Sequence, residues 1–180
     1  MDIGDAINRN NSTKKSDNFY VSFLRLPNNI SNILGRQVRS ITRPVLQFEE
    51  SATRMGRHKH NHIHQVRFEP IRIMFDDDEG SLISQFIHAH VFRQLNIQTS
   101  LPEKWRDLME DDDRFDLKVE IFDQTNKVVD GFVLIDCSIL SAEMSELNVE
   151  TDTNASVDVS IQYDSIEFWI VDDWVEFRPN

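Results

Sequence analysis

Four histidines at alternating positions are the residues of this chain best suited to chemistry. They are His58, His60, His62 and His64, within the segment RHKHNHIH. If this segment is a β-strand, all four imidazoles lie on one face, because side chains alternate between the two faces of a strand. Imidazole is a common ligand of zinc and nickel ions, so the spacing suits a metal-binding strand.

The surroundings of these histidines argue against a physiological metal site. No cysteine or carboxylate is interleaved with them, whereas zinc sites usually draw ligands from more than one element. Arg54, Arg57, Lys59 and Arg67 flank the run and would repel a cation. We therefore expect no metal and no cofactor. We interpret the segment as a basic loop that contacts an acidic surface on another copy, with a solvated loop tip as the alternative.

No other group of residues indicates an enzyme. The chain contains no Ser–His–Asp order, no HExxH motif and no glycine-rich phosphate loop, and it has only 5 glycines. The acidic runs Asp76–Glu79 and Glu110–Asp113 lack the spacing of a calcium loop. A helix N-terminus and a solvated connector explain them better. We therefore predict a protein without catalytic residues.

Composition narrows the class of protein further. The net charge of −12 over 180 residues argues against a general nucleic-acid binder, although an acidic lining would suit a conduit that DNA passes without binding. The single cysteine, Cys137, is expected to be a buried small hydrophobe in a reducing compartment. No segment approaches the roughly 20 apolar residues that span a bilayer. The N-terminal residues lack the apolar stretch of a signal peptide.

Alternating apolar residues predict the strands that must position the polar segment. We expect strands over residues 19–23, 37–42, 45–48, 65–75, 115–121, 128–140 and 157–163. Pro70 should interrupt the fourth of these, and QTNK should form a hairpin turn between the fifth and sixth. Val133, Ile135, Cys137 and Ile139 are expected to share one face. Residues 51–64 between two strands read as a long polar loop.

One amphipathic helix is predicted at about residues 81–95, with Ser81 as its N-cap. Residues 28–35 read as a short helical turn closed by Gly35. The fold class is therefore mainly β, a small antiparallel β-barrel or sandwich with one packed helix and extended loops. We expect a flexible N-terminal arm over 1–17, a single domain over 18–169 and a C-terminal extension over 170–180.

The order and spacing of these elements resemble the tail tube proteins of large, contractile-tailed bacteriophages of the myovirus type. The resemblance covers residues 18–169. Its most specific parts are the SITRP corner, the polar loop leading into VRFEPIRIMFDDD, the helix after it, and NVETDTNASVDVSIQYDSIEF with Tyr163 and the closing Trp169. The tube proteins of secretion-system needles share that family's fold.

The resemblance implies a structural virion protein without enzymatic activity, which forms the inner tail tube. Six copies would close into a ring, and stacked rings would form the conduit for DNA ejection. The implied partners are further copies, the tail sheath protein, the tape-measure protein, and the baseplate and tail terminator proteins, with transient passage of DNA and no membrane insertion. The implied location is the virion tail, after assembly in the host cytoplasm.

The resemblance also gives roles to two groups of residues. The polar loop takes the place of one that reaches an adjacent subunit or ring, with interface residues Arg54, Met55, Arg57, His58, Lys59, His60, His62 and His64. Polar residues that alternate with core residues would line the lumen, and the candidates are Asp116, Lys118, Glu120, Asp158, Ser160 and Gln162. Two alternatives remain: a tube-end homologue (baseplate tube initiator or tail terminator), and a metal-binding β-domain that uses His58–His64.

Overall fold

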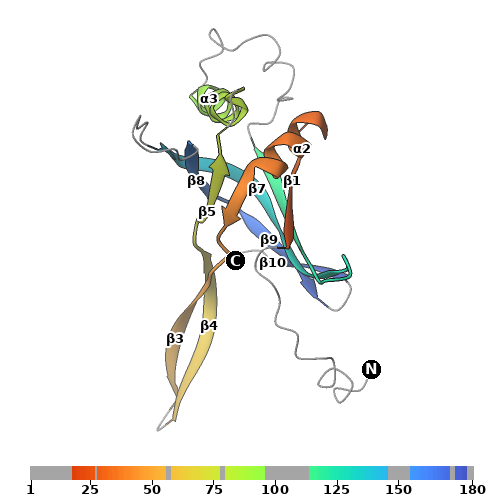
Figure 1. Ribbon diagram of the computed structural model, residues 1–180. Helices are drawn as coiled ribbons and strands as arrows, with labels where there is room; N and C mark the ends of the chain where they lie inside the picture. The colour runs from red at the N-terminus through yellow and green to blue at the C-terminus, as the bar shows by residue number, and fades with distance from the viewer. Residues whose placement is uncertain are drawn as a thin grey trace.

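The computed structural model describes residues 18–26, 28–55, 58–77, 80–95, 114–145, 155–170 and 173–177. Side chains are described within these ranges except at 28–29, 50–55, 58–65, 170 and 173–177. The described residues form, in chain order, β1 (Phe19–Leu24), α2 (Asn28–Gln37), β2 (Val38–Ile41), β3 (Leu46–Met55), β4 (His58–Phe68), β5 (Ile71–Asp76), α3 (Leu82–Gln94), β6 (Phe115–Phe122), β7 (Val128–Met144), β8 (Ser156–Gln162), β9 (Ser165–Ile170) and β10 (Asp173–Phe177). Figure 1 shows their arrangement. The expected arm over 1–17 lies outside the described residues.

The strands form one curled antiparallel sheet in the order β1-β6-β7-β8-β5-β2, to which β9 and β10 are added beside β7. The 17-residue strand β7 is long enough to pair with different strands in its first and second parts. We name as sheet A the strands β1, β6, β9, β10 and β7 up to Cys137. We name as sheet B the strands β2, β5, β8 and β7 from Ser138 onward. Since β1 and β2 end the sheet without meeting, the fold is the sandwich and not the closed barrel.

Both sheets and helix α3 share one core. In β6 every second residue is buried, and the same alternation holds in β5 and β8, as the sequence predicted. The ring of Phe23 on β1 lies 6.2 Å from Phe75 on β5, 5.9 Å from Phe86 on α3 and 5.7 Å from Phe115 on β6, between centroids. Aromatic rings at these separations stabilise a core beyond the area that they bury. Cys137 is also buried, as expected.

The sequence predicted one helix over the described residues, and the structure has two. The short helical turn expected over 28–35 is the ten-residue helix α2, and Gly35 lies inside it instead of closing it. A Cβ atom built on Gly35 would lie 2.2 Å from the carbonyl oxygen of Val21. The glycine is therefore required by the close approach of α2 to β1, which the sequence alone does not reveal.

Helix α3 is where the sequence predicted it, but it begins differently. Ser81 adopts the left-handed conformation (φ 50°) and makes no capping hydrogen bond with its side chain. Instead, the side-chain amide of Gln85 donates to the carbonyl oxygen of Gly80 at 2.9 Å. Ser81 therefore occupies the predicted N-cap position, and its carbonyl oxygen accepts the N–H of Gln85 at 3.0 Å, but its side chain does not cap the helix. Its left-handed backbone differs from the extended conformation in which an N-cap side chain reaches the first turn.

The polar segment over 51–64 is not a loop. It forms the outer part of a two-stranded antiparallel hairpin, β3–β4, in which Leu46 pairs with Phe68 and Met55 pairs with His58. The hairpin is a sheet of its own and projects away from the other strands (Figure 1). The prediction failed because a strand that packs on no core needs no alternation of apolar residues, and alternation was the signal used.

Two further features of the strands differ from expectation. In β7, Leu134 and Cys137 are both fully buried, so the predicted common phase of Val133, Ile135, Cys137 and Ile139 is wrong. A bulge at Asp136, where φ is 55°, shifts the alternation by one residue. Within the segment 170–180, which we set apart as an extension, residues 173–177 form β10 and pair with β9.

Candidate assembly interface

Sheet B has an open edge on each side. On one side β2 pairs with β5 alone, and no described strand lies beyond it. On the other side β6 ends its pairing where Phe115 lies opposite Cys137, so no described strand accompanies β7 from Ser138 to Met144 along that edge. Unpaired strand edges present free N–H and C=O groups and are ready to pair with another chain.

The two helices cover other parts of the sheet edges. At β1, the hydroxyl oxygen of Ser31 on α2 accepts a hydrogen bond from the backbone N–H of Phe23 at 3.1 Å. On β7, Nε2 of His90 on α3 accepts from the backbone N–H of Ile139 at 3.2 Å. Helix α2 thus closes the β1 end of the sheet. Helix α3 meets β7 at Ile139, near the start of the open stretch.

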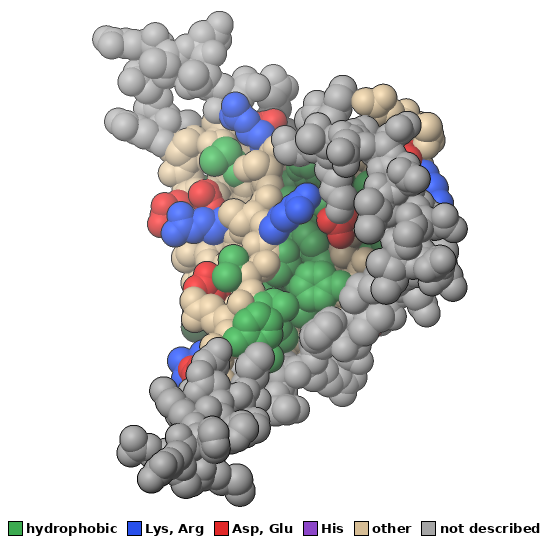
Figure 2. Space-filling view, turned by 90° about the horizontal axis from the view of Figure 1, so that it is seen from below, with side chains coloured by type: hydrophobic (Ala, Val, Ile, Leu, Met, Phe, Trp, Pro, Cys, Tyr) green, Lys and Arg blue, Asp and Glu red, His purple; other side chains and the backbone are tan. Residues whose placement is uncertain are grey.

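Large exposed hydrophobic side chains lie on the open part of β7 and at the base of the hairpin. Leu140 and Met144, on the open part of β7, are 57% and 55% exposed. Val45 and Phe48, at the base of the β3–β4 hairpin, are 49% and 56% exposed. The hairpin points downward in Figure 1, and Figure 2 shows the molecule from below. Hydrophobic side chains gather on this lower face. Apolar side chains that gather on a surface indicate a protein–protein contact.

The base of the hairpin is fixed to the sandwich. The ring of Phe68, the last residue of β4, stacks on the buried ring of Tyr163 with centroids 5.3 Å apart. The backbone N–H of Glu69 donates to the carbonyl oxygen of Val45 at 3.4 Å, and the Gln47 side-chain amide donates to the Glu69 carboxylate. The hairpin therefore leaves the sandwich from a defined base.

The structure places the two groups of expected lumen residues on different sheets. Asp158, Ser160 and Gln162 alternate with buried residues of β8, in sheet B. Asp116, Lys118 and Glu120 alternate with buried residues of β6, in sheet A. Each group therefore lies on the face of its sheet that points away from the core, and only the β8 group belongs to the sheet with two open edges.

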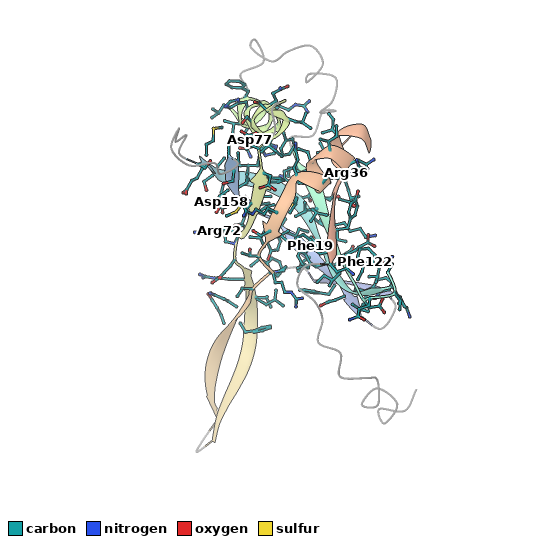
Figure 3. The ribbon with its side chains drawn as sticks, viewed as in Figure 1. Phe19, Arg36, Arg72, Asp77, Phe122 and Asp158 are labelled. Carbon is teal, nitrogen blue, oxygen red and sulfur yellow. The ribbon has the colours of Figure 1, made fainter. Side chains whose placement is uncertain are left out.

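The polar face of sheet B is nearly balanced in charge and contains several serines. Register places Asp158 opposite Met74 and Glu143, and Ser160 opposite Arg72 and Ser141. Arg72 and Asp158 come from the neighbouring strands β5 and β8 (Figure 3). Arg39 lies 3.7 Å from Asp76 at the β2 side. These described residues therefore do not make this face strongly acidic, although the net charge of the chain is −12.

The polar face of sheet A contains ion pairs. Lys118 Nζ lies 2.8 Å from Glu120 Oε1 on the same strand. Asp116 accepts hydrogen bonds from the guanidinium of Arg25 and from the backbone N–H of Asp136. These three residues of β6 are therefore engaged within one copy of the chain.

The predicted interface residues of the hairpin are placed by their backbone only. Arg57 lies outside the described residues, and so do the side chains of Arg54, Met55, His58, Lys59, His60, His62 and His64. The backbone register pairs His58 with Met55, His60 with Thr53 and His62 with Ser51. The register shifts between Glu49 and Glu50, and this removes His64 from the regular ladder. The interface role of this segment and the alternative of a metal site both stay predictions.

Sequence reasoning missed the open edges and the positions of Leu140 and Met144. Their signal is pairing between strands distant in sequence, which alternation within one strand does not report.

Burial raises the pKa of the Cys137 thiol, which is consistent with the inert buried cysteine that we expected. Over the described residues, neither α2 nor α3 is long and apolar enough to cross a membrane.

Comparison with known proteins identifies the fold. No protein-family model and no curated protein matches the chain. Among solved structures, a chain in the sheath–tube complex of an extracellular contractile injection system (PVC, extended state) matches with a TM-score of 0.61 and 11% identity, covering 95% of this chain and 99% of its own. A chain in the tube-terminating cap of the anti-feeding prophage (AFP) matches with a TM-score of 0.63 and 12% identity, covering 93% and 98%.

An Hcp protein matches with a TM-score of 0.51 and 8% identity, covering 90% of this chain and 98% of its own. Each likeness covers nearly the whole of both chains, so it concerns the complete sandwich and not one motif. The chain has the tail tube fold, which confirms the expectation from the sequence.

Proposed function

We propose that this chain is a subunit of the inner tube of a phage tail or a phage-like contractile tail, and that it works by assembly and not by catalysis. The observation that supports this most is the four-stranded sheet B with an open edge on both sides. The shared fold supports it too, because the structures that match include chains in a sheath–tube complex and in a tube-terminating cap.

The directions of the four strands suit a ring. Each neighbouring pair in sheet B is antiparallel, so β7 and β2, at opposite edges, run in opposite directions. A copy rotated about an axis along the strands can therefore place its β2 beside β7 of the first copy in an antiparallel ladder. Repeating this head-to-tail contact closes a ring, and we propose a hexameric one. Its wall would be a continuous barrel without free edges.

In such a ring the polar face of sheet B lines the lumen. The side chains of Asp158, Ser160 and Gln162 would face the passage, whereas those of Asp116, Lys118 and Glu120 would lie outside it on sheet A. The near balance of charges on this wall, together with its serines, would present little net positive charge to a polyanion. We propose that DNA, guided by the tape-measure protein, passes through it during ejection.

The β3–β4 hairpin would join consecutive rings. It projects from a fixed base that exposes Val45 and Phe48, and its outer half is the most basic segment of an acidic chain. A basic projection meeting an acidic surface of the next copy gives a contact that propagates instead of closing. The sheath, baseplate and tail terminator proteins are the other proposed partners, in the virion tail and, before that, in the host cytoplasm.

A tube-end protein is the second candidate. It is supported by the match to the AFP tube-terminating cap, whose TM-score of 0.63 is similar to the 0.61 of the PVC sheath–tube chain. An end protein, such as a baseplate tube initiator or a tail terminator, would form rings through the same edges but would not stack into long tubes.

Negative-stain electron microscopy of the purified chain across a concentration series tests the proposal. Hollow tubes of increasing length support the tube subunit, isolated rings support the end protein, and monomers at every concentration argue against both. Leu140→Lys places a charge on the open edge of β7 and should abolish rings. Leu95→Lys is the matched control, because Leu95 is also exposed but lies at the end of α3 and not on a strand edge. If both variants assemble like the natural chain, the β7 edge is not the interface.

A further inference from the structure

Strand β7 changes sheets at Asp136, and a second register shift follows between Ile139 and Ser141 within sheet B. Asp136 has φ 55°, a conformation that residues with a Cβ rarely adopt, and it forms the bulge between the part of β7 in sheet A and the part in sheet B. Arg25, just after β1, has φ 63° and is the ionic partner of Asp136, with 2.6 Å between Nη2 and Oδ1. Two strained residues distant in sequence are therefore bonded to each other.

Groups from neighbouring segments bond the backbone N–H and C=O groups around the bulge. The N–H of Asp136 donates to Oδ1 of Asp116 at 2.9 Å, and its carbonyl oxygen accepts from Nη1 of Arg114 at 3.3 Å. The carbonyl oxygen of Ile135 accepts from the backbone N–H of Asp164 at 3.0 Å. Arg25 then bonds both carboxylates, Asp116 and Asp136. Strained backbone persists only where the surroundings hold it in this way.

We propose that Arg25, Asp116 and Asp136 form a charged clamp that sets the direction in which β7 leaves sheet A. The clamp thereby positions the open edge, Ser138–Met144, for pairing with β2 of a second copy. This inference rests on the proposed assembly through the edges of sheet B. The three residues are positioning residues, since they act on the partner through β7 and do not touch it.

The location of the clamp explains why it would matter for assembly more than for the core. The open edge starts two residues after Asp136 and is paired with β8 on its other side, so a rotation at the bulge would turn this part of sheet B, with its edge, relative to sheet A. The core contacts of β7 on the two sides of the bulge, Leu134 and Cys137, are each held by packing. A looser bulge should therefore leave the sandwich folded while the edge samples directions that do not match β2 of another copy.

Glycine substitutions remove the ionic contacts of the clamp without adding backbone strain. Asp136→Gly and Arg25→Gly both tolerate positive φ and both remove the ionic contact. Asp136→Asn also tolerates positive φ and keeps an oxygen that can accept from Arg25, so it should retain part of the effect. Lys118→Gln is the matched control, because it breaks the Lys118–Glu120 ion pair on the same face of sheet A without touching the bulge.

Two measurements on the full chain decide the matter. The first is the concentration at which rings or tubes appear, followed by sedimentation and microscopy. The glycine variants should need a concentration roughly tenfold higher or more for assembly. Asp136→Asn should need a concentration between theirs and that of the natural chain. Lys118→Gln should assemble at the same concentration as the natural chain. Assembly of the glycine variants at the natural concentration, or an equal loss in Lys118→Gln, would overturn the clamp.

The second measurement is amide hydrogen exchange in the monomer, and it does not depend on assembly. Asp136→Gly should lower the protection of amides in 138–144 by roughly tenfold while those of β6 keep theirs. If protection over 138–144 is unchanged, the clamp does not position β7 and the inference fails. If the natural chain itself never assembles, the proposed function fails, whereas the exchange result still decides whether the clamp fixes the edge.

Discussion

His90 and Ile139 join helix α3 to strand β7 by one buried hydrogen bond, in which Nε2 of the imidazole accepts from the backbone N–H at 3.2 Å. The imidazole is fully buried, and only the neutral ring with its proton on Nδ1 can accept at Nε2. The bond fixes α3 over the start of the open edge. An apolar residue at this position would leave the N–H of Ile139 without this acceptor.

Replacement of His90 by phenylalanine should destabilise the chain by about 1–3 kcal/mol, because the N–H of Ile139 would be buried without an acceptor. His90→Gln keeps an acceptor and should cost less. Chemical denaturation followed by circular dichroism measures both. Equal stability of His90→Phe and the natural chain would show that the hydrogen bond contributes nothing to folding.

Gly35→Ala should destabilise the chain although alanine favours helices. The new methyl group would lie 2.2 Å from the Val21 carbonyl oxygen, so α2 has to move away from β1. Helix propensity alone would stabilise the variant by about 1 kcal/mol. We expect instead a loss of about 1–3 kcal/mol from overpacking. The melting temperature measures it, and Arg36→Ala, at an exposed position of the same helix, is the control. A rise in melting temperature would contradict the close packing of α2 on β1.

Tyr163→Phe should leave stability at pH 7 unchanged or raise it by up to about 1 kcal/mol. The Tyr163 hydroxyl is buried and has no hydrogen-bond partner among the described residues, so its removal costs no hydrogen bond within them. The stack on Phe68 is kept. Urea denaturation tests this, and a clear loss of stability would show that the hydroxyl has a partner.

Ionisation of the same hydroxyl should make the stability of the folded chain depend on pH at alkaline values. Burial raises the pKa of Tyr163 from 10 to about 12. Between these values the unfolded chain releases this proton and the folded chain keeps it, so stability falls as the pH rises from about 10 to about 12. Tyr163→Phe should lose less stability than the natural chain over that interval. Parallel slopes for the two proteins would refute the assignment.

The turn between β6 and β7 should depend on the Asp123 carboxylate. Its Oδ1 accepts from the Thr125 hydroxyl at 2.6 Å, from the N–H of Thr125 at 2.7 Å and from the N–H of Lys127 at 3.0 Å. The Thr125 hydroxyl, followed by the Lys127 N–H, lowers the pKa of Asp123 below its ordinary 3.8. The stabilisation is therefore present above that value and is lost as the pH falls below it.

Asp123→Ala should thus be less stable than the natural chain at pH 7, and the difference should shrink once the pH falls below the ordinary Asp value. Thermal denaturation of the two proteins at pH 7 and at a pH below 3.8 measures this difference. Asn126→Gly is the control in the same turn, because Asn126 has φ 60° and glycine accepts that conformation. A pH-independent difference would mean that the charge of Asp123 is not what stabilises the turn.

Deletion of residues 52–63 should leave a folded protein that forms rings but does not stack them. The hairpin pairs only with itself, so its outer half is not part of the ladder of either sheet. Circular dichroism checks folding and electron microscopy checks assembly. Tubes formed by this variant would show that the hairpin does not join rings.

A chelator should change neither the melting temperature nor the assembly of the natural chain, because we expect no metal on the histidines of β4. The same measurements with and without the chelator test this. A clear loss of stability with chelator would revive the metal-binding alternative at His58–His64.

The sequence predicted those parts of the fold that rest on one strand or one helix. The alternation in β6 and β8 and the apolar face of α3 report burial directly, because each residue keeps its face along a regular element. Gly35 was misinterpreted because its reason is a contact with Val21 on another element. Asp136 was missed because a bulge depends on partners such as Arg25 and Asp116, which lie far away in the sequence.

The candidate interface was predicted only in part for the same reason. The basic character of 51–64 is visible in the sequence, but its hairpin structure and fixed base are not. The open edges of sheet B depend on which strand lies beside which, and no single strand contains that information. The two triplets of polar residues on β6 and β8 have the same pattern, so only topology separates them.

Strand β7 belongs to both sheets, and this has a mechanical consequence. Where two sheets are held together by packed side chains alone, a pulling force separates them by sliding apolar surfaces. Here a single covalent backbone runs from Val128 in one sheet to Met144 in the other. In the proposed tube, a push along the axis would pass from sheet B to sheet A of each subunit through peptide bonds, so the two sheets would move as one body.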